Sequence, residues 1–159
     1  MPRLPRPRIP DGIYHVGTRG VRKSAIYRSD DDRELFRGLL FRVARSRTWT
    51  IYAYCLMTNH YHLVVQTPNA DISEGMNYVN GVYALAFNAR HGCEGHVFER
   101  RFWSRVIESE ADLLVCSAYV LENPVRAGLC RTIDDWTWSG GAILRQVPVP
   151  VMSGASPRT

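Results

Sequence analysis

The chain has almost no lysine, no paired cysteines and no long apolar run. Lys23 is the only lysine, and the other nineteen basic residues are arginine. The four cysteines include no Cys-x-x-Cys pair, which argues against a zinc framework or an exported disulfide scaffold. No apolar run approaches the roughly 20 residues that span a bilayer, and the basic start MPRLPRPRIP lacks the apolar stretch of a secretory signal. We therefore expect a cytoplasmic protein with no membrane partner.

The composition fits one folded domain with an anionic partner. Of 159 residues, 45% are hydrophobic and 22% are charged, which suffices for a packed core. The net charge of +5 points to nucleic acid as the commonest anionic partner. Arginine grips phosphate in two places at once, although a GC-rich genome also explains the arginine bias. The net positive charge remains under either explanation.

The hydrophobic patterns alternate between strand and helix periods. They predict strands at 13–19, 49–57, 60–67 and 102–108, and helices at 30–47, 71–91 and from 109 onward. The order β-α-β-β-α-β-α is typical of an α+β, ferredoxin-like (RRM-like) fold, with an antiparallel sheet and helices on one face. We expect a flexible basic Pro/Arg arm at 1–12, a folded domain at 13–145 and a disordered tail at 146–159.

Two histidines stand one residue apart in the apolar segment MTNHYHLVV. Side chains alternate faces along a strand, so His60 and His62 share one face at a spacing of roughly 6.6–7 Å. Tyr61, Leu63 and Val65 take the opposite face, which should pack on the helices. Two imidazoles at this spacing can converge on one divalent metal. The alternative is a pair of hydrogen-bonded histidines on an exposed sheet face.

The third helix presents a tyrosine away from its expected core. Ser109 is the predicted N-cap, and Pro124 is predicted to end the helix at Asn123. At about 100° per residue, Tyr119 falls nearly opposite the apolar stripe, on the side of Cys116 and Asn123. Asn123 is its neighbour one turn later. The expected core stripe comprises Leu113, Leu114, Ser117, Val120 and Leu121.

These motifs together resemble a known family. NHYH (59–62), AYVLENPVRAGL (118–129) and YHVGTRG (14–20) occur in the order seen in the single-tyrosine HUH (IS200-like) transposases, and among them the REP-associated tyrosine transposases. The segments VFERRFWSRVIESEADLL (97–114) and WTWSG (136–140) support the likeness, which covers roughly 13–140. Thr58 stands where the family often has proline. The resemblance implies an HUH endonuclease core.

The resemblance also implies a chemistry. His60 and His62 would hold Mg²⁺ or Mn²⁺, Asn123 would complete the metal site, and Tyr119 would be the catalytic nucleophile. The enzyme would cleave and rejoin single-stranded DNA at hairpin-flanked sites through a 5′-phosphotyrosine intermediate. Its partner would be single-stranded DNA with a hairpin, bound by a monomer or homodimer associated with the nucleoid.

Several further residues carry two interpretations. Trp136 and Trp138 could stack on unpaired bases or, more simply, pack in the core. His15 could line the metal site or be an ordinary strand histidine. Four arginines could contact DNA phosphates or be solvated surface residues. They are Arg19, Arg100, Arg101 and Arg105.

Two other functions compete with the transposase interpretation. The same fold could be catalytically idle and domesticated, and bind DNA hairpins only. Alternatively, the metal could activate water, which would make Tyr119 incidental. A covalent protein–DNA adduct forms only under the tyrosine mechanism, so it separates that mechanism from a metal-activated water.

Overall fold

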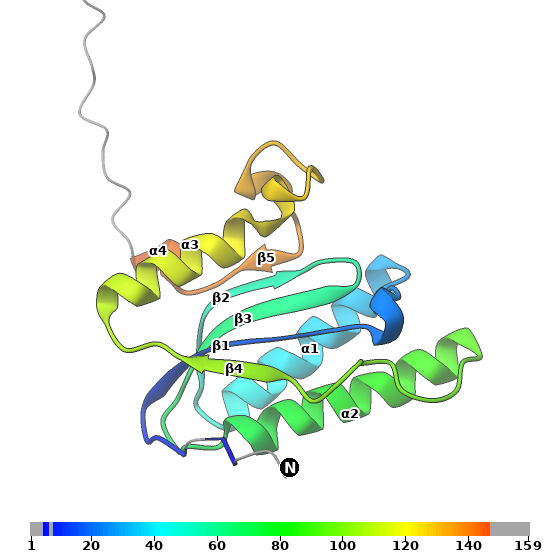
Figure 1. Cartoon of the computed structure of the whole chain (residues 1–159), viewed down its shortest axis with the longest axis horizontal. Coiled ribbons are helices and arrows are strands. Elements are labelled where there is room, and N and C mark those ends of the chain that lie inside the picture. Colours follow the sequence, from blue (N-terminus) through cyan, green and yellow to red (C-terminus); the bar gives the residue numbers. More distant parts are fainter. Residues whose placement is uncertain (1–4, 7, 147–159) are drawn as a thin grey trace, which may run out of the picture.

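Five strands form one antiparallel sheet in the order β4-β1-β3-β2-β5 in the computed structural model, which describes residues 5, 6 and 8–146 (Figure 1). The strands are β1 (Gly12–Arg19), β2 (Thr50–Leu56), β3 (His60–Thr67), β4 (Trp103–Val106) and β5 (Ser139–Gly140). The helices are α1 (Asp30–Ser46), α2 (Ile72–His91), α3 (Glu110–Arg126) and α4 (Ile143–Gln146). Two short 3₁₀ turns complete the described chain, η1 (Val21–Lys23) and η2 (Ile133–Asp135).

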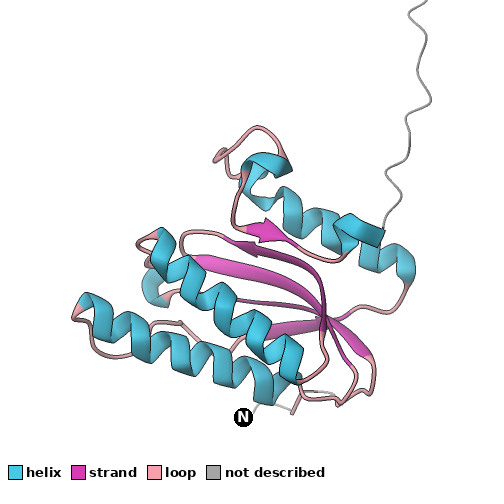
Figure 2. Cartoon of the chain, turned by 180° about the vertical axis from the view of Figure 1, so that it is seen from behind, coloured by secondary structure: helices cyan, strands magenta, loops and turns pink. Residues whose placement is uncertain are grey.

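The helices occupy both faces of the sheet. Seen from behind, α1 and α2 cover one face (Figure 2), and their apolar residues share one buried cluster with β1, β2 and β3. Helix α3 packs on the other face, mainly against β2 and β3, with a second cluster of its own. The α+β class with an antiparallel sheet is therefore confirmed. The expectation that helices lie on one face holds for α1 and α2 and is corrected for α3.

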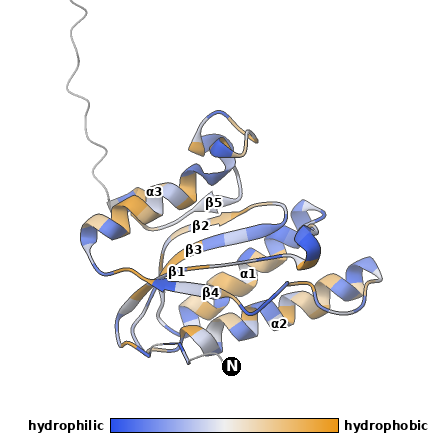
Figure 3. Ribbon diagram, viewed as in Figure 1, coloured by the Kyte–Doolittle hydropathy of each residue, from blue (hydrophilic) through white to orange (hydrophobic). Residues whose placement is uncertain are grey.

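The period-2 pattern of β3 explains this layering. Tyr61, Leu63 and Val65 are fully buried in the cluster beneath α1 and α2. His60 and His62 project to the opposite face, where α3 lies. Hydrophobic and hydrophilic residues alternate around α1 and α2, as expected for helices with one buried side (Figure 3). The predicted division of this strand into an apolar face and a histidine face is confirmed.

A buried carboxylate ties the start of α1 to the end of α2. Asp32 is 1% exposed and accepts hydrogen bonds from the Arg28 backbone N–H (2.9 Å), the Arg90 guanidinium (2.7 Å) and the His91 ring (2.7 Å). Burial alone would raise the pKa of this carboxyl. The three donors outweigh burial and hold the pKa below the ordinary value of 3.8.

Asp32→Asn should destabilise the fold by about 2–3 kcal/mol, because the amide carries no charge and turns N–H groups toward hydrogen-bond donors. The lowered folded-state pKa means that the carboxylate contributes fully above about pH 4 and loses its contribution as the pH falls through the folded-state pKa. Urea unfolding at neutral and acid pH measures both effects. Asp31→Asn, at an exposed first-turn position, is the control and should cost about 1 kcal/mol or less. Equal losses in the two variants would contradict this account.

Helix α3 differs from its prediction in its core stripe and its end. Ser109 caps it as expected, with its side chain accepting from the Asp112 N–H. Pro124 lies inside the helix, which continues to Arg126, so the predicted end at Asn123 is wrong. The proline ring is buried, and this packing offsets the single hydrogen bond that proline forgoes. The buried residues of α3 are Cys116, Ser117, Val120, Leu121 and Pro124, whereas Leu114 is 50% exposed.

The outer parts of the chain add contacts that the patterns did not predict. Strand β5 pairs with β2, and α4 includes Gln146, where the composition predicts the start of the tail. Residues 147–159 lie outside the described part of the chain. In the arm, the Arg6 guanidinium lies over the Phe102 ring at 3.6 Å from its centroid, and Arg8 pairs with Glu74 at 2.6 Å. Residues 1–4 and 7 of the arm also fall outside the description. None of the helices in the described residues is both long and apolar enough to cross a membrane.

Candidate active site

The sheet register gathers three histidines on the face that α3 covers. Gly17 on β1 faces His62 on β3 and Trp103 on β4, so these three residues form one row across the sheet. His15 lies two residues earlier on β1, on the same face. In the next row, Arg19 faces His60. The ring centroids of His60 and His62 lie 5.1 Å apart, and those of His15 and His62 lie 5.2 Å apart.

Each histidine of the HxH pair uses its Nδ1 in a hydrogen bond. The His60 Nδ1 lies 2.7 Å from the Asn59 Oδ1, and the Asn59 amide nitrogen donates to the Lys23 carbonyl (3.3 Å). The His62 Nδ1 lies 3.0 Å from the His15 Nε2. Metal-binding histidines commonly hold their other ring nitrogen in such a bond. Nε2 is therefore the atom that each imidazole has left for a ligand.

The environment favours the neutral form of all three imidazoles. Burial, reinforced by His60, His15 and Arg126, lowers the pKa of His62 to about 3. Burial and the Arg105 charge lower the pKa of His15 to about 4, although Asp112 partly opposes this. Burial also lowers the pKa of His60. Neutral imidazole is the form that binds a metal, so the pair needs to release no proton to do so at neutral pH.

The residues present fit a divalent cation whose remaining ligands would be oxygen atoms and water. His60 and His62 offer two nitrogen donors. Among residues 5, 6 and 8–146, no group of three or more His, Cys, Asp or Glu side chains is placed to hold a metal. Any further protein ligand must therefore be of another kind, such as an amide oxygen. Asn123, half-buried on α3 one turn after Tyr119, is the amide side chain that the sequence analysis suggests as a ligand.

Tyr119 lies beside the histidines. Its side chain is 49% exposed, and its ring centroid lies 6.2 Å from those of His15 and His62. The predicted placement of Tyr119 away from the buried stripe is confirmed. The Arg126 guanidinium lies 4.0 Å from the centre of the tyrosine ring and donates to the Tyr119 carbonyl at 2.6 Å. Arg126, the last residue of α3, therefore holds the tyrosine ring from the C-terminal side of the helix.

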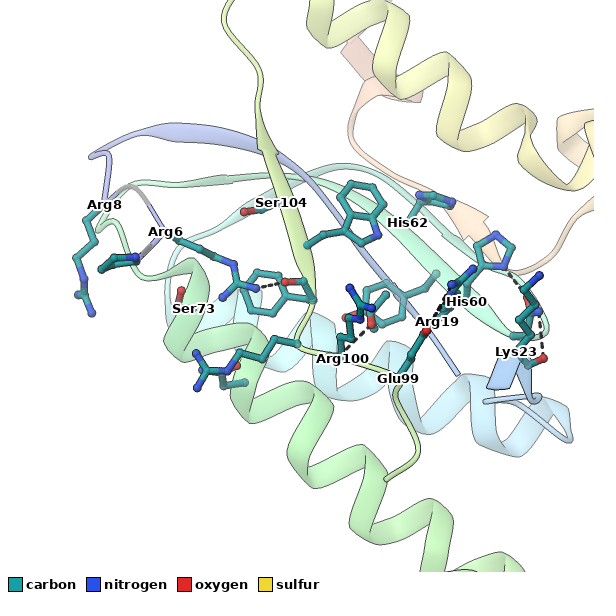
Figure 4. Close-up of a pocket in the computed structure, with 18 residues that line it drawn as sticks. Arg6, Arg8, Arg19, Lys23, His60, His62, Ser73, Glu99, Arg100 and Ser104 are labelled. Atoms are coloured by element: carbon teal, nitrogen blue, oxygen red, sulfur yellow. Dashed lines mark hydrogen bonds and ion pairs between the residues drawn. The ribbon is translucent and has the colours of Figure 1, made fainter. Parts of the chain in front are cut away.

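A basic cleft of about 1200 Å³ adjoins the histidine pair. Figure 4 shows His60 and His62 at one end of this cleft, Arg6 and Arg8 at the other, and Arg100 between them. Tyr119 is not among the lining residues, whereas His62 lines the cleft and has its ring 6.2 Å from the tyrosine ring. The cleft is lined by six basic side chains and one acidic one, Glu99. The basic residues are Arg6, Arg8, Arg19, Lys23, Arg100 and Arg101.

The four arginines predicted to contact phosphate fall into two groups. Arg100 and Arg101 are exposed, line the cleft and have no ion-pair partner among the described residues. Arg19 also lines the cleft but pairs with Glu99. Arg105 lies outside the cleft lining and makes two hydrogen bonds with Asp112, at 2.9 and 3.1 Å. Arg100 and Arg101 are therefore the cations most available to a ligand.

The remaining candidates are also placed. Trp138 is 8% exposed within the core, and Trp136 is half-buried and donates to the Leu56 carbonyl, so both tryptophans have packing roles. His15, for which the sequence left both interpretations open, lies with its Nε2 3.0 Å from the His62 Nδ1 and so borders the histidine pair. Sequence reasoning did not single out Asn59 or Arg126. Asn59 directly precedes the HxH pair, and Arg126 follows Tyr119 by two helical turns, so both carried a spacing signal.

Comparison with known proteins assigns the family. The profile described as "Transposase IS200 like" matches residues 10–123, which include the HxH pair, Tyr119 and Asn123. The chain belongs to the IS200-like transposase family. An Escherichia coli K12 member named REP-associated tyrosine transposase is 23% identical over 107 residues, covering 67% of this chain and 62% of the relative. A Haemophilus influenzae protein with the provisional name of a REP-associated tyrosine transposase is 27% identical over 115 residues, covering 62% and 65%.

A solved structure extends the likeness of this IS200-like chain to the fold. It is described as a REP-associated tyrosine transposase bound to a REP hairpin, and it superposes with a TM-score of 0.73 at 22% identity, covering 91% of this chain and 84% of that one. At this identity the similarity establishes the fold. The present chain spans slightly less than two thirds of the length of the two curated relatives.

Proposed function

We propose that this IS200-like protein is a single-stranded DNA endonuclease and strand transferase that acts at hairpin-flanked sites. Tyr119 is the nucleophile, and His60, His62 and Asn123 hold a divalent cation, Mg²⁺ or Mn²⁺. The observation that carries the proposal is the position of an exposed tyrosine 6.2 Å, ring to ring, from a neutral histidine whose Nε2 is free for a ligand. The hairpin-bound structure of a protein with this fold supports the choice of DNA.

The reaction is a balanced phosphoryl transfer. The Tyr119 hydroxyl loses its proton and its oxygen attacks a backbone phosphorus, while the bond from that phosphorus to the 3′ oxygen breaks. The 3′ oxygen takes up a proton and leaves as a hydroxyl, and the 5′ phosphate stays on the tyrosine. One phosphodiester replaces another, so a 3′-hydroxyl of a second strand can reverse the step and join DNA without ATP.

Each part of the site has a distinct task in this scheme. A bound cation supplies charge stabilisation at the phosphate oxygens. Asn59 and His15 hold His60 and His62 in position through their Nδ1 atoms. Arg126 holds the tyrosine ring against the histidine face. The cleft residues Arg100 and Arg101 supply charge along the DNA backbone.

The direct test incubates the protein with Mn²⁺ and a labelled single-stranded hairpin from the flanks of its own gene. Denaturing electrophoresis should reveal a slow-migrating adduct that carries the DNA downstream of the nick. Binding without an adduct, across several flanking hairpins and both metals, would favour the hairpin-binding module instead. Cleavage without an adduct would favour a metal-activated water.

Arg100→Ala/Arg101→Ala should weaken DNA binding and flatten its salt dependence. Each lost phosphate contact lowers the slope of log K against log salt by about 0.7 for single strands. Arg42→Ala, an exposed arginine on α1 outside the cleft, is the control. Fluorescence anisotropy over a series of salt concentrations measures both quantities. An unchanged slope in the double variant would remove these arginines from the DNA interface.

A further inference from the structure

Trp103 is a large aromatic side chain exposed inside the basic cleft. It lies on β4, lines the cleft and is 44% exposed. The other tryptophans are less available, since Trp49 and Trp138 are 7% and 8% exposed and Trp136 is half-buried with its N–H bonded to Leu56. Its position in a cleft lined by arginines suits a ligand that combines a flat apolar face with negative charge.

The indole is held in place on one side. It lies over the backbone of Gly17, where an added Cβ would come within 2.7 Å of the Trp103 Cζ2. His15 meets it edge-on, with centroids 4.7 Å apart and an interplanar angle of 80°. The glycine therefore lets the ring rest on the sheet, and the histidine packs against it. The exposed part of the ring is ready for a partner without losing rotamer freedom on binding.

The position of Trp103 relative to the histidines defines where that partner lies. Its ring centroid is 5.8 Å from that of His62. Arg100 and Arg101 precede it by three and two residues on the same segment, and both line the cleft with it. A planar apolar surface beside arginines is an arrangement with which proteins bind unpaired nucleotides, because the cations contact the phosphates and the bases stack on the ring.

We propose that Trp103 is a stacking platform for the unpaired nucleobase next to the phosphate that is cleaved. This inference rests on the proposed function and adds a base-binding position to it. Stacking does not depend on base identity, so Trp103 fixes the position of the strand and does not read its sequence. The sequence suggested Trp136 and Trp138 for stacking, but both are packed in the fold. Trp103 is therefore the tryptophan available for stacking among the described residues.

The first test compares Trp103→Leu with Trp103→Phe. A base-stacking platform predicts a loss of roughly 5- to 150-fold in affinity for single-stranded hairpin DNA with leucine, and substantial recovery with phenylalanine. Tyr78→Leu is the matched control, because Tyr78 is 48% exposed on α2 and lies outside the cleft lining. If Trp103 had only a structural role, both variants would unfold at a lower urea concentration, and Trp103→Leu and Trp103→Phe would bind DNA with the same affinity.

A second test locates the base. The intrinsic tryptophan fluorescence should be quenched by DNA in the wild type and not in Trp103→Phe. Wild-type protein should bind a hairpin that is abasic at the nucleotide beside the nick more weakly than it binds intact DNA. Trp103→Leu should bind the abasic and the intact hairpin with equal affinity. Equal affinity of Trp103→Leu and wild type for intact DNA, with an adduct still forming, would overturn the platform and leave the proposed function standing. Absence of any DNA binding or adduct in wild type would instead defeat the proposed function itself.

Discussion

Tyr119→Phe should abolish the covalent protein–DNA adduct and leave hairpin affinity within a few-fold of wild type. Only the hydroxyl is removed, and that oxygen is the atom that would bond to phosphorus. The side chain is 49% exposed, and the phenyl ring can keep its contacts with Arg126 and the histidines. Folding stability should therefore change little. Electrophoresis of labelled DNA measures the adduct, and anisotropy measures the affinity.

Tyr78→Phe is the matched control for this substitution. Tyr78 is exposed to almost the same extent, at 48%, but lies on α2, away from the histidine face. It should form as much adduct as wild type. An adduct that persists in Tyr119→Phe would assign the nucleophile elsewhere, and a collapse of folding would show that Tyr119 is needed for packing.

His62→Ala should lower the affinity for Mn²⁺ by at least about 10- to 100-fold, because even the loss of a group that only orients a metal ligand has an effect of that size. His60→Ala should act in the same direction. Titration calorimetry of the protein without DNA measures the affinity independently of cleavage. The Nδ1 contacts to Asn59 and His15 leave the Nε2 atoms as the donors that these substitutions remove.

His96→Ala is the control for the metal titration. His96 is exposed in the connection between α2 and β4, outside the cleft lining and the histidine cluster. Its replacement should leave Mn²⁺ affinity unchanged. If neither His60→Ala nor His62→Ala altered the affinity, the two histidines would be hydrogen-bonded surface residues and not metal ligands.

Local periodicity predicted much of the site. Alternation along 60–67 was enough to put His60 and His62 on a face apart from the core, and the helical angle put Tyr119 away from the buried stripe. Both placements follow from residues within one element. The bounds of the four predicted strands and three predicted helices agree with the structure to within two residues, apart from the end of α3.

The contacts between elements could not be predicted in this way. His15 reaches His62 only because β1 pairs with β3 in one particular register. The separate pairing of β1 with β4 puts Trp103 across from Gly17, a neighbour 86 positions away in the chain. The continuation of α3 past Pro124 also depends on tertiary packing, since that ring is buried against the rest of the fold. Pairing of β5 with β2 adds a strand of two residues, too short to leave a pattern.

The most direct test of the central claim is the mass of the tryptic peptide 106–126 after reaction with DNA and Mn²⁺. Trypsin cleaves after Arg105 and Arg126, and Tyr119 is the only tyrosine between them. The account predicts that this peptide carries a nucleotide joined through its 5′ phosphate to Tyr119. An unmodified peptide alongside cleaved DNA with a free 5′ phosphate would contradict it and make water the nucleophile.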